Sequence, residues 1–291
     1  MQLRIDLFWI VFLLLSIGVS AASAQIRVTT SPDVTLELGA NLQVVTDDRF
    51  AIGFSQPSAV YVPPLSGLPE SAAIAAYAVL DDGVGATSLL TFESDVPLPG
   101  GIVARRGDVV AVDGSGSFSI QLDASAIGIP DGVVTDALVS DGPALYLSFD
   151  GTVALAGGVL AADEDLVRWD GAAFALAFDG SAVGIDPSLD LDAADRTDGF
   201  WAVSFDAGGI VAGVPFADED VLEYSPAAGS WSPTLVFEGA AVDPNWAAGD
   251  VEAFAVPEAG IVTMLASGTL FLIIVRGRRT RAGRIADRIA A

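Results

Sequence analysis

The tetrapeptide Leu147-Ser148-Phe149-Asp150 belongs to an internal repeat that decides the predicted fold. It recurs as Leu90-Thr91-Phe92-Glu93 and as Val203-Ser204-Phe205-Asp206, at offsets of 57 and 56 residues. Two later segments keep the same order in all three copies, and they begin at Asp108, Asp165 and Asp220 and at Ile120, Leu176 and Leu235. Because order and spacing are both kept, the repeat predicts a chain built from similar structural units.

Within each copy, short runs of alternating side chains are separated by Asp-Gly and Gly-rich turns. A period of two is typical of β-strands. In residues 145–149 the pattern places Leu145, Leu147 and Phe149 on one face of a strand and the intervening residues on the other. By the same alternation, Phe174, Leu176 and Phe178 are expected to share a face.

We therefore predict an all-β fold, a propeller-like array of four-stranded units with a period of about 56 residues. The units are placed at about 85–142, 143–198 and 199–256, with a degenerate copy at 33–84. A tandem β-sandwich or an open β-solenoid are the alternatives.

The two ends of the repeated region hold strands without partners of their own. Residues 34–38 are interpreted as the last strand of a unit, residues 41–55 as the first two strands of the next, and residues 250–256 as an opening strand. A closing strand from one end and an opening strand from the other would complete one unit between them, as in many propellers.

Residues 25–256 are strongly acidic, since six arginines and no lysine face 35 of the 38 acids, a formal charge of −29. Such a surface repels phosphate, so nucleic acid is excluded as a partner. The sequence has no Cys and no His, which excludes disulfides, Ser-His-Asp triads and zinc sites with Cys or His ligands.

Residues 1–24 have the form of a secretory signal peptide, with Arg4 before an apolar core at residues 7–19. Small residues follow, and Ala22-Ser23-Ala24 predicts cleavage before Gln25. The predicted partner of this segment is the secretion translocon.

The last residues have three parts. Val256, Pro257 and Glu258 precede an apolar run of 16 residues at 260–275, which as a helix would reach roughly 24 Å and is expected to enter the inner membrane. An Arg-rich tail follows, and positive charge beside an apolar segment stays on the cytoplasmic side, which leaves residues 25–256 outside. The tail begins with Arg276, Arg278, Arg279 and Arg281.

This arrangement resembles the PEP-CTERM sorting signal of Gram-negative bacteria, with Ala259 in place of the family's second proline. The resemblance covers residues 257–291 and implies recognition by an exosortase, a membrane-embedded cysteine transpeptidase. It also implies a destination at the cell envelope, the surface or the extracellular matrix.

Two acidic triplets lie at matching places in the second and third copies. Clustered carboxylates are the oxygen ligands that Ca²⁺ prefers, so weak calcium binding is one expectation there, and a solvated turn is the other. No further cofactor is expected. The triplets are Asp163-Glu164-Asp165 and Asp218-Glu219-Asp220.

For function, the sequence favours a non-catalytic exported surface or matrix protein associated with exopolysaccharide, since it offers charge and surface but no recognisable catalytic motif. The alternative is an extracellular propeller that binds or cleaves carbohydrate through a pair of carboxylates. In that alternative the tryptophans at 169, 201, 231 and 246 stack on sugars, although packing within the fold is the favoured role.

Overall fold

The computed structural model describes residues 26–31, 34–38, 41–45, 52–55, 58–61, 68–69, 72–81, 86–197, 199–242 and 244–255. Contacts within the chain divide it into two units, and all of these residues belong to the unit Gln25–Val256. The predicted signal peptide and the sorting tag lie outside the described residues. Among the helices that are described, none has the length and apolar character needed to span a membrane.

The described residues form four antiparallel sheets of four strands each, which confirms the all-β prediction and the four-stranded unit. The first three sheets each use consecutive parts of the chain. In order within each sheet, the strands are β6 (Ile74–Asp81), β7 (Ala86–Phe92), β10 (Val109–Val112) and β11 (Phe118–Leu122); then β12 (Leu138–Asp141), β13 (Ala144–Leu147), β16 (Leu166–Trp169) and β17 (Phe174–Phe178); then β18 (Ala193–Thr197), β19 (Phe200–Ser204), β22 (Leu222–Ser225) and β23 (Ser230–Trp231).

The fourth sheet joins the two ends of the unit. Its strands are β24 (Asp250–Ala255), β1 (Ile26–Ser31), β4 (Ile52–Ser55) and β5 (Ser58–Tyr61). Strand β24 pairs with β1 in an antiparallel register that places Arg27 opposite Ala255. Strands from both ends therefore complete one unit, as predicted, but the strand that β24 joins is β1 and not residues 34–38.

Each sheet carries a hairpin between its second and third strands. The hairpins are β2 (Val34–Leu38) with β3 (Asn41–Val45), β8 (Val96–Leu98) with β9 (Ile102–Ala104), β14 (Val153–Ala154) with β15 (Leu160–Ala161), and β20 (Gly209–Val211) with β21 (Val214–Phe216). The assignment of residues 34–38 and 41–55 to the sheets of two successive units was therefore wrong. Alternation identified these strands, but a hairpin strand alternates in the same way as a sheet strand.

Short helices occupy the connections. In two hairpins, η1 (Pro99–Gly101) and η3 (Ala156–Gly158) turn the chain. After the fourth strands, η2 (Ser125–Ile127) and η4 (Ser181–Val183) end at Gly128 and Gly184, whose φ angles of 89° and 95° suit glycine. The last connection contains α2 (Gly239–Val242) and η5 (Pro244–Ala248).

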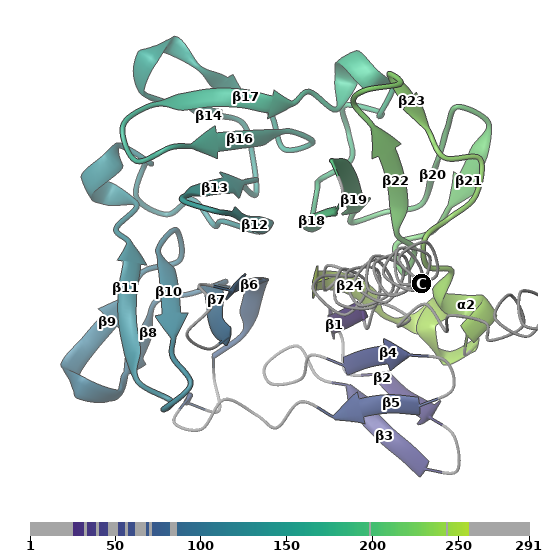
Figure 1. The fold of residues 1–291 in the computed structure, drawn as a ribbon, viewed down its shortest axis with the longest axis horizontal. Coiled ribbons are helices and arrows are strands. Elements are labelled where there is room, and N and C mark those ends of the chain that lie inside the picture. Colours follow the sequence, from purple (N-terminus) through teal and green to yellow (C-terminus); the bar gives the residue numbers. More distant parts are fainter. Residues whose placement is uncertain are drawn as a thin grey trace, which may run out of the picture. The chain divides into compact units, whose positions relative to one another are not determined.

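The innermost strands of the four sheets contact one another in a closed circle. Strand β24 lies against β6, β6 against β12, β12 against β18, and β18 against β24 (Figure 1). This gives residues 26–255 a propeller-like arrangement of sheets. Each sheet begins one strand earlier than the units marked in the sequence, because its innermost strand precedes the strand that contains the repeated tetrapeptide.

Hydrophobic side chains fill the space between successive sheets. Leu145, Leu147 and Phe149 belong to one buried cluster and Tyr146 to the next, so the predicted division between two faces is confirmed. Both faces are buried, and the second one is not lined by small residues alone, since Tyr146 packs edge-on against Trp201 at a centroid distance of 5.0 Å.

The predicted shared face of Phe174, Leu176 and Phe178 was wrong. The register between β16 and β17 shifts between Leu166 and Val167, because Leu166 faces Phe178 whereas Val167 faces Leu176. A bulge of this kind inserts one residue and reverses the alternation beyond it. Phe174 and Phe178 consequently enter different clusters, and Leu176 is exposed.

Candidate functional site

The last acid of each triplet closes a turn. The carboxylate of Asp165 accepts backbone N–H groups from Ala162 at 2.9 Å and Gly180 at 3.0 Å. Asp220 makes the same pair of bonds, to Ala217 at 2.9 Å and Gly239 at 3.0 Å. Each of these carboxylates therefore joins the turn before the third strand to the connection that comes after the fourth strand.

The middle acids of the triplets are buried. Glu164 and Glu219 are 3% and 4% exposed, and burial raises the pKa of each. They lie against Gly180 and Gly239, where an added Cβ would come within 2.6 Å of the glutamate Cγ. Their place in the fold is therefore tightly packed.

The first acids act through their backbone. The carbonyl oxygen of Asp163 accepts the N–H of Leu191 at 3.1 Å, and that of Asp218 accepts the N–H of Val251 at 3.3 Å. Leu191 and Val251 lie near the start of the innermost strand of the next sheet, so each bond joins two successive sheets. Among the described residues, no group of three or more acids is spaced to hold a bare metal ion. Calcium at the six triplet residues stays a prediction, although the structure gives most of these groups protein partners.

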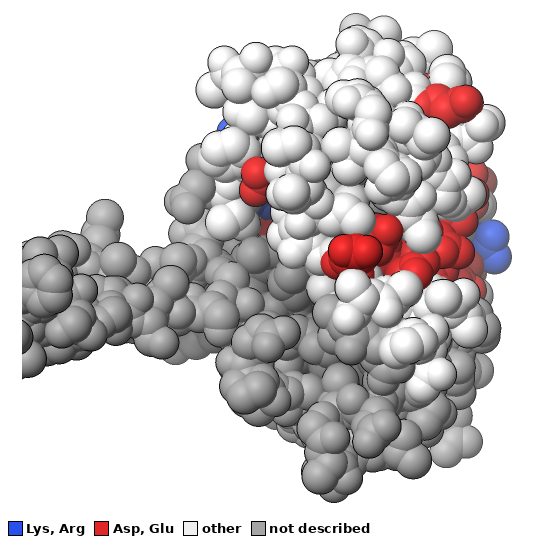
Figure 2. Space-filling view, turned by 90° about the vertical axis from the view of Figure 1, so that its right-hand side faces the viewer, with Lys and Arg blue, Asp and Glu red and all other residues white. Residues whose placement is uncertain are grey.

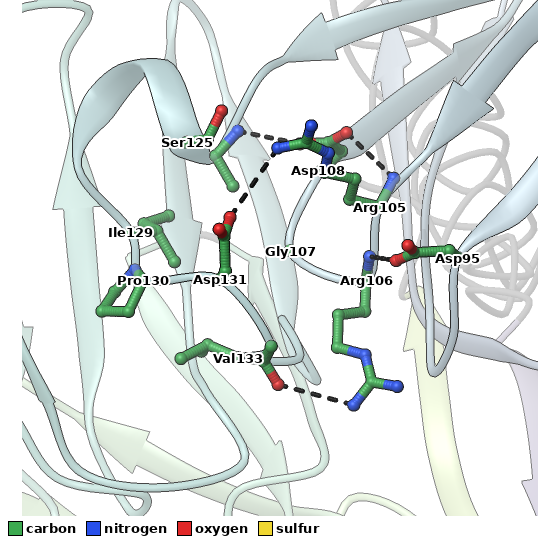
Figure 3. Close-up of a pocket in the computed structure, with 12 residues that line it drawn as sticks. Asp95, Arg105, Arg106, Gly107, Asp108, Ser125, Ile129, Pro130, Asp131 and Val133 are labelled. Carbon is green, nitrogen blue, oxygen red and sulfur yellow. Dashed lines mark hydrogen bonds and ion pairs between the residues drawn. The ribbon is translucent and has the colours of Figure 1, made fainter.

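In the first copy the corresponding turn is Arg106-Gly107-Asp108, at the edge of a cavity of about 610 Å³ (Figure 3). Asp108 is 4% exposed and accepts N–H groups from Arg105 at 3.0 Å and Ala124 at 2.9 Å. A Cβ at Gly107 would meet that of Ala124 at 3.0 Å. This tripeptide therefore forms a structural turn, and its carboxylate is not presented to a partner.

A second cavity, of about 290 Å³, lies at the starting ends of the innermost strands. It receives one residue from each of the four: Ala75 from β6, Asp136 from just before β12, Asp192 from just before β18, and Glu252 from β24. The rest of its lining is Glu93, Val134, Asp150 and Asp190. We call this acid-lined space the central cavity.

Asp136 and Asp192 occupy the same position in successive sheets. Asp136 precedes Ala137, whose carbonyl accepts the N–H of Ser148, and Asp192 precedes Ala193, which pairs with Ser204. In the first sheet, Thr91 takes the place of Ser148 and Ser204, and it pairs with Ala76. The residue before Ala76, which is Ala75, therefore matches Asp136 and Asp192. The repeat thus directs this position into the central cavity, and two of these three sheets place a carboxylate there.

Asp136 is the most enclosed of the cavity acids. Its exposed fraction is 8%, and neither carboxyl oxygen makes a well-aligned hydrogen bond, although the backbone N–H groups of Asp136 and Ala137 lie close enough to act against the rise in its pKa. Burial, followed by the charges of Asp190 and Asp150, raises its pKa well above the usual range. A buried carboxylate without a partner is costly unless it is protonated or meets a cation.

Neighbouring acids show the same effect. Burial, followed by the charges of Asp250 and Asp136, raises the pKa of Asp192 to about 10. The pKa of Asp190 is raised to about 7 by burial and then by Asp163 and Asp206. For Asp250, burial is again the first cause of a pKa raised to about 7. Several of these groups are consequently protonated at neutral pH in the absence of a cation.

Two further acids position the segments that carry the cavity residues. Asp150 accepts the N–H of Val134 at 2.9 Å, and Asp206 accepts the N–H of Asp190 at 2.9 Å. These are the last residues of the repeated tetrapeptide in two copies. Their carboxylates hold the chain two residues before Asp136 and Asp192 respectively.

Positive charge is scarce around these groups. Among the described residues, Asp136, Asp190 and Asp192 make no ion pair. Arg105, Arg168 and Arg196 pair with other acids, such as Arg196 with Asp141 at 2.8 Å. Figure 2 shows acidic side chains gathered in a band on one side of the described surface, with little Lys or Arg beside it.

The predicted sugar-stacking tryptophans lie in packed positions, in agreement with the favoured role. Trp201 and Trp246 are 3% and 0% exposed, whereas Trp169 and Trp231 are partly buried against the hydrophobic clusters. The indole N–H of Trp231 donates to the carbonyl of Val183 at 2.9 Å. None of them lines the central cavity.

The sequence interpretation missed the central cavity, although a signal was present. Asp136 and Asp192 each stand 11 residues before the matched positions Leu147 and Val203. The segment from Asp190 to Asp192 is also acid-rich, but its spacing does not fit the Asp-x-Asp-x-Asp-Gly pattern of a calcium loop.

Comparisons with known proteins give no family. No family model matches the chain, and no curated protein matches it. One similar solved structure is the extracellular domain of the putative one component system BT4673 from B. thetaiotaomicron, with a TM-score of 0.33 and 11% identity over 76% of this chain and 29% of that one. Another is YCF48 bound to D1 peptide, with a TM-score of 0.27 and 7% identity over 73% of this chain and 70% of that one. The chain thus spans less than a third of the first structure, and neither likeness bears on function.

Proposed function

We propose that the chain is an exported, non-catalytic protein of the cell surface or extracellular matrix, associated with exopolysaccharide. Its route follows from the two terminal segments: the translocon exports it, the apolar run at residues 260–275 holds it in the inner membrane, and an exosortase processes it at Pro257 and Glu258. The destination is the envelope of a Gram-negative bacterium.

The proposal of a non-catalytic protein rests on acidic side chains that recur in the repeat and hold the backbone together by hydrogen bonds. Asp108, Asp165 and Asp220 each accept two backbone N–H groups at the same turn. Carboxylates engaged in this way hold a scaffold together and are not available to a substrate. A rigid acidic body fits a protein whose work is to present surface and charge.

A carbohydrate-cleaving protein is the second candidate, because the central cavity combines several carboxyl groups with raised pKa values. General acid catalysis needs a pKa near the working pH, and the pKa values of Asp190 and Asp250, about 7, meet that condition. The cavity has no described aromatic wall on which a sugar ring would stack, which favours the scaffold.

A panel of polysaccharides separates the two candidates. For the scaffold we expect retention on neutral exopolysaccharide, or no interaction, and no release of reducing ends. Turnover that disappears in Asp190→Asn or Asp250→Asn but persists in the exposed control Asp131→Asn would refute the scaffold and establish a glycosidase.

Export is tested by fractionation. The full chain should be found in the envelope, and a chain that ends after Val256 should appear in the soluble secreted fraction. Replacing Arg276, Arg278, Arg279 and Arg281 by Gln should impair retention, whereas replacing Arg284 and Arg288 provides a matched but milder change. Intact protein in the cytosol would refute the proposal.

A further inference from the structure

The central cavity gathers carboxyl groups, and none of the described ion pairs involves Asp136, Asp190 or Asp192. Segments of all four sheets supply its acids, and its only other described lining residues are one alanine and one valine. The acids are Glu93, Asp136, Asp150, Asp190, Asp192 and Glu252. Carboxylates that share a partly buried space repel one another much more strongly than they would in water. A bound cation would remove this repulsion.

Asp136 gives an independent sign that a ligand belongs there. It lines the cavity, is more than nine-tenths buried, and has two oxygens without hydrogen-bond partners. Buried polar atoms are almost always paired in folded proteins, so an unpaired carboxylate at a cavity wall indicates a missing partner. The acids that form turns elsewhere, such as Asp165, have their bonds complete.

We propose that the central cavity binds one partly hydrated calcium ion, with the carboxylates of Asp136 and Asp192 as its principal ligands. The site is distinct from the acidic triplets considered in the sequence. Calcium binding at this site goes beyond the proposed function, because it depends neither on export nor on association with polysaccharide.

The chemistry of the lining favours calcium over other cations. Calcium accepts six to eight oxygens in flexible geometry, which the six carboxyl groups of the lining and bound water can supply, whereas magnesium demands a near-ideal octahedron. An organic ammonium ion would be expected to find an aromatic face, and none lines the cavity. Since no three described acids are spaced for a bare ion, the calcium keeps part of its water shell.

Calorimetric titration of the purified full-length protein, after treatment with a chelator, tests the site directly. We expect saturable binding of one calcium ion per chain, and a melting temperature raised more by CaCl₂ than by MgCl₂ or NaCl at equal ionic strength. Equal effects of the three salts, or no saturable binding to the wild-type protein, would overturn the proposal.

Substitutions then locate the ion. Asp136→Asn and Asp192→Asn keep the side-chain size, replace a buried carboxyl group of raised pKa by a neutral amide and should leave the metal-free protein at least as stable. Each should weaken calcium binding by roughly tenfold or more. The control Asp131→Asn makes the same charge change at a side chain that is 86% exposed and should bind calcium as the wild type does.

A third pair of variants distinguishes the central cavity from the triplets. Asp165→Asn and Asp220→Asn change the triplet acids that are fully bonded to backbone, and both should retain the calcium-specific shift in melting temperature. Loss of the shift in these variants, with retention in Asp136→Asn and Asp192→Asn, would place the ion at the triplets and overturn the proposal.

Discussion

Asp192, directly before β18, shares a hydrogen bond with Asp250 at the start of β24. The two carboxyl groups come from successive sheets, about one repeat apart in the chain, and they meet because β18 lies against β24. A hydrogen bond between two carboxyl groups requires one of them to hold a proton. The contact between these two innermost strands therefore helps to raise the pKa of Asp192.

The first prediction concerns pH. In a chelating buffer, the melting temperature should fall as the pH rises from about 5 to 8, by about 5 °C or more. The pKa of Asp190 and of Asp250 is about 7 in the folded protein against an ordinary 3.8, so the folded state holds protons that the unfolded state has released. Stability from these groups is full below about pH 4 and is lost as the pH passes 7.

The same scan has an internal control. Asp192, with a pKa of about 10, extends the loss to alkaline pH, so Asp192→Asn should flatten the profile above pH 7. Exposed turn acids such as Asp113 and Asp186 have lowered pKa values and lose their stabilising effect only as the pH falls below about 4. A melting temperature that rises between pH 5 and 8 would contradict the assignment.

The second prediction tests the repeated ties. Asp165→Asn replaces one accepting oxygen by an NH₂ group, which leaves a backbone N–H of Ala162 or Gly180 unpaired. Destabilisation of about 1–3 kcal/mol is expected from one lost acceptor in a buried turn. Chemical denaturation of Asp165→Asn and Asp220→Asn measures it, with the exposed Asp131→Asn as control. An effect no larger than that of the control would show that the ties are dispensable.

The third prediction concerns the glycines beneath the buried glutamates. In Gly180→Ala and Gly239→Ala the new Cβ would lie 2.5 Å and 2.8 Å from the carbonyl oxygens of Glu164 and Glu219, so the backbone must shift. Overpacking of this kind costs about 1–3 kcal/mol. Gly151→Ala is the matched control, because nothing lies within 4 Å of its added Cβ. Thermal unfolding should separate the two classes, and similar melting temperatures would mean that the turn yields easily.

The sequence predicted the strand content and the closure of the unit because both depend on local alternation and on the repeat. It could not predict the bulge in β17, since Phe174, Leu176 and Phe178 alternate regularly and only the pairing with β16 reveals the inserted residue. The hairpin strands β2 and β3 were misassigned for a related reason: alternation is the same in a sheet strand and in a hairpin strand.

Local sequence patterns could not predict the central cavity. Asp136 and Asp192 recur at matching positions, yet a repeated acid is as consistent with a solvated turn as with a site. What makes them a site is the convergence of four innermost strands on one space, where Glu252 from the far end of the chain joins them. That convergence depends on long-range geometry that spacing alone does not contain.

The last prediction tests closure of the circle. Strand β24 completes the fourth sheet by pairing with β1, and it buries Val251 and Phe254, which are 0% and 1% exposed. A chain that ends at Gly249 loses this pairing, leaves β1 with an open edge and removes two core side chains, each worth roughly 2–5 kcal/mol. Its melting temperature should fall by about 10 °C or more, or its cooperative transition should disappear. The matched control ends after Val256 and keeps β24, so it should melt like the full chain. Because Asp250 and Glu252 are also lost in the shorter chain, calcium binding should weaken with it, whereas the control should bind as the full chain does. If the two truncated proteins melt at the same temperature, β24 does not close the circle in solution.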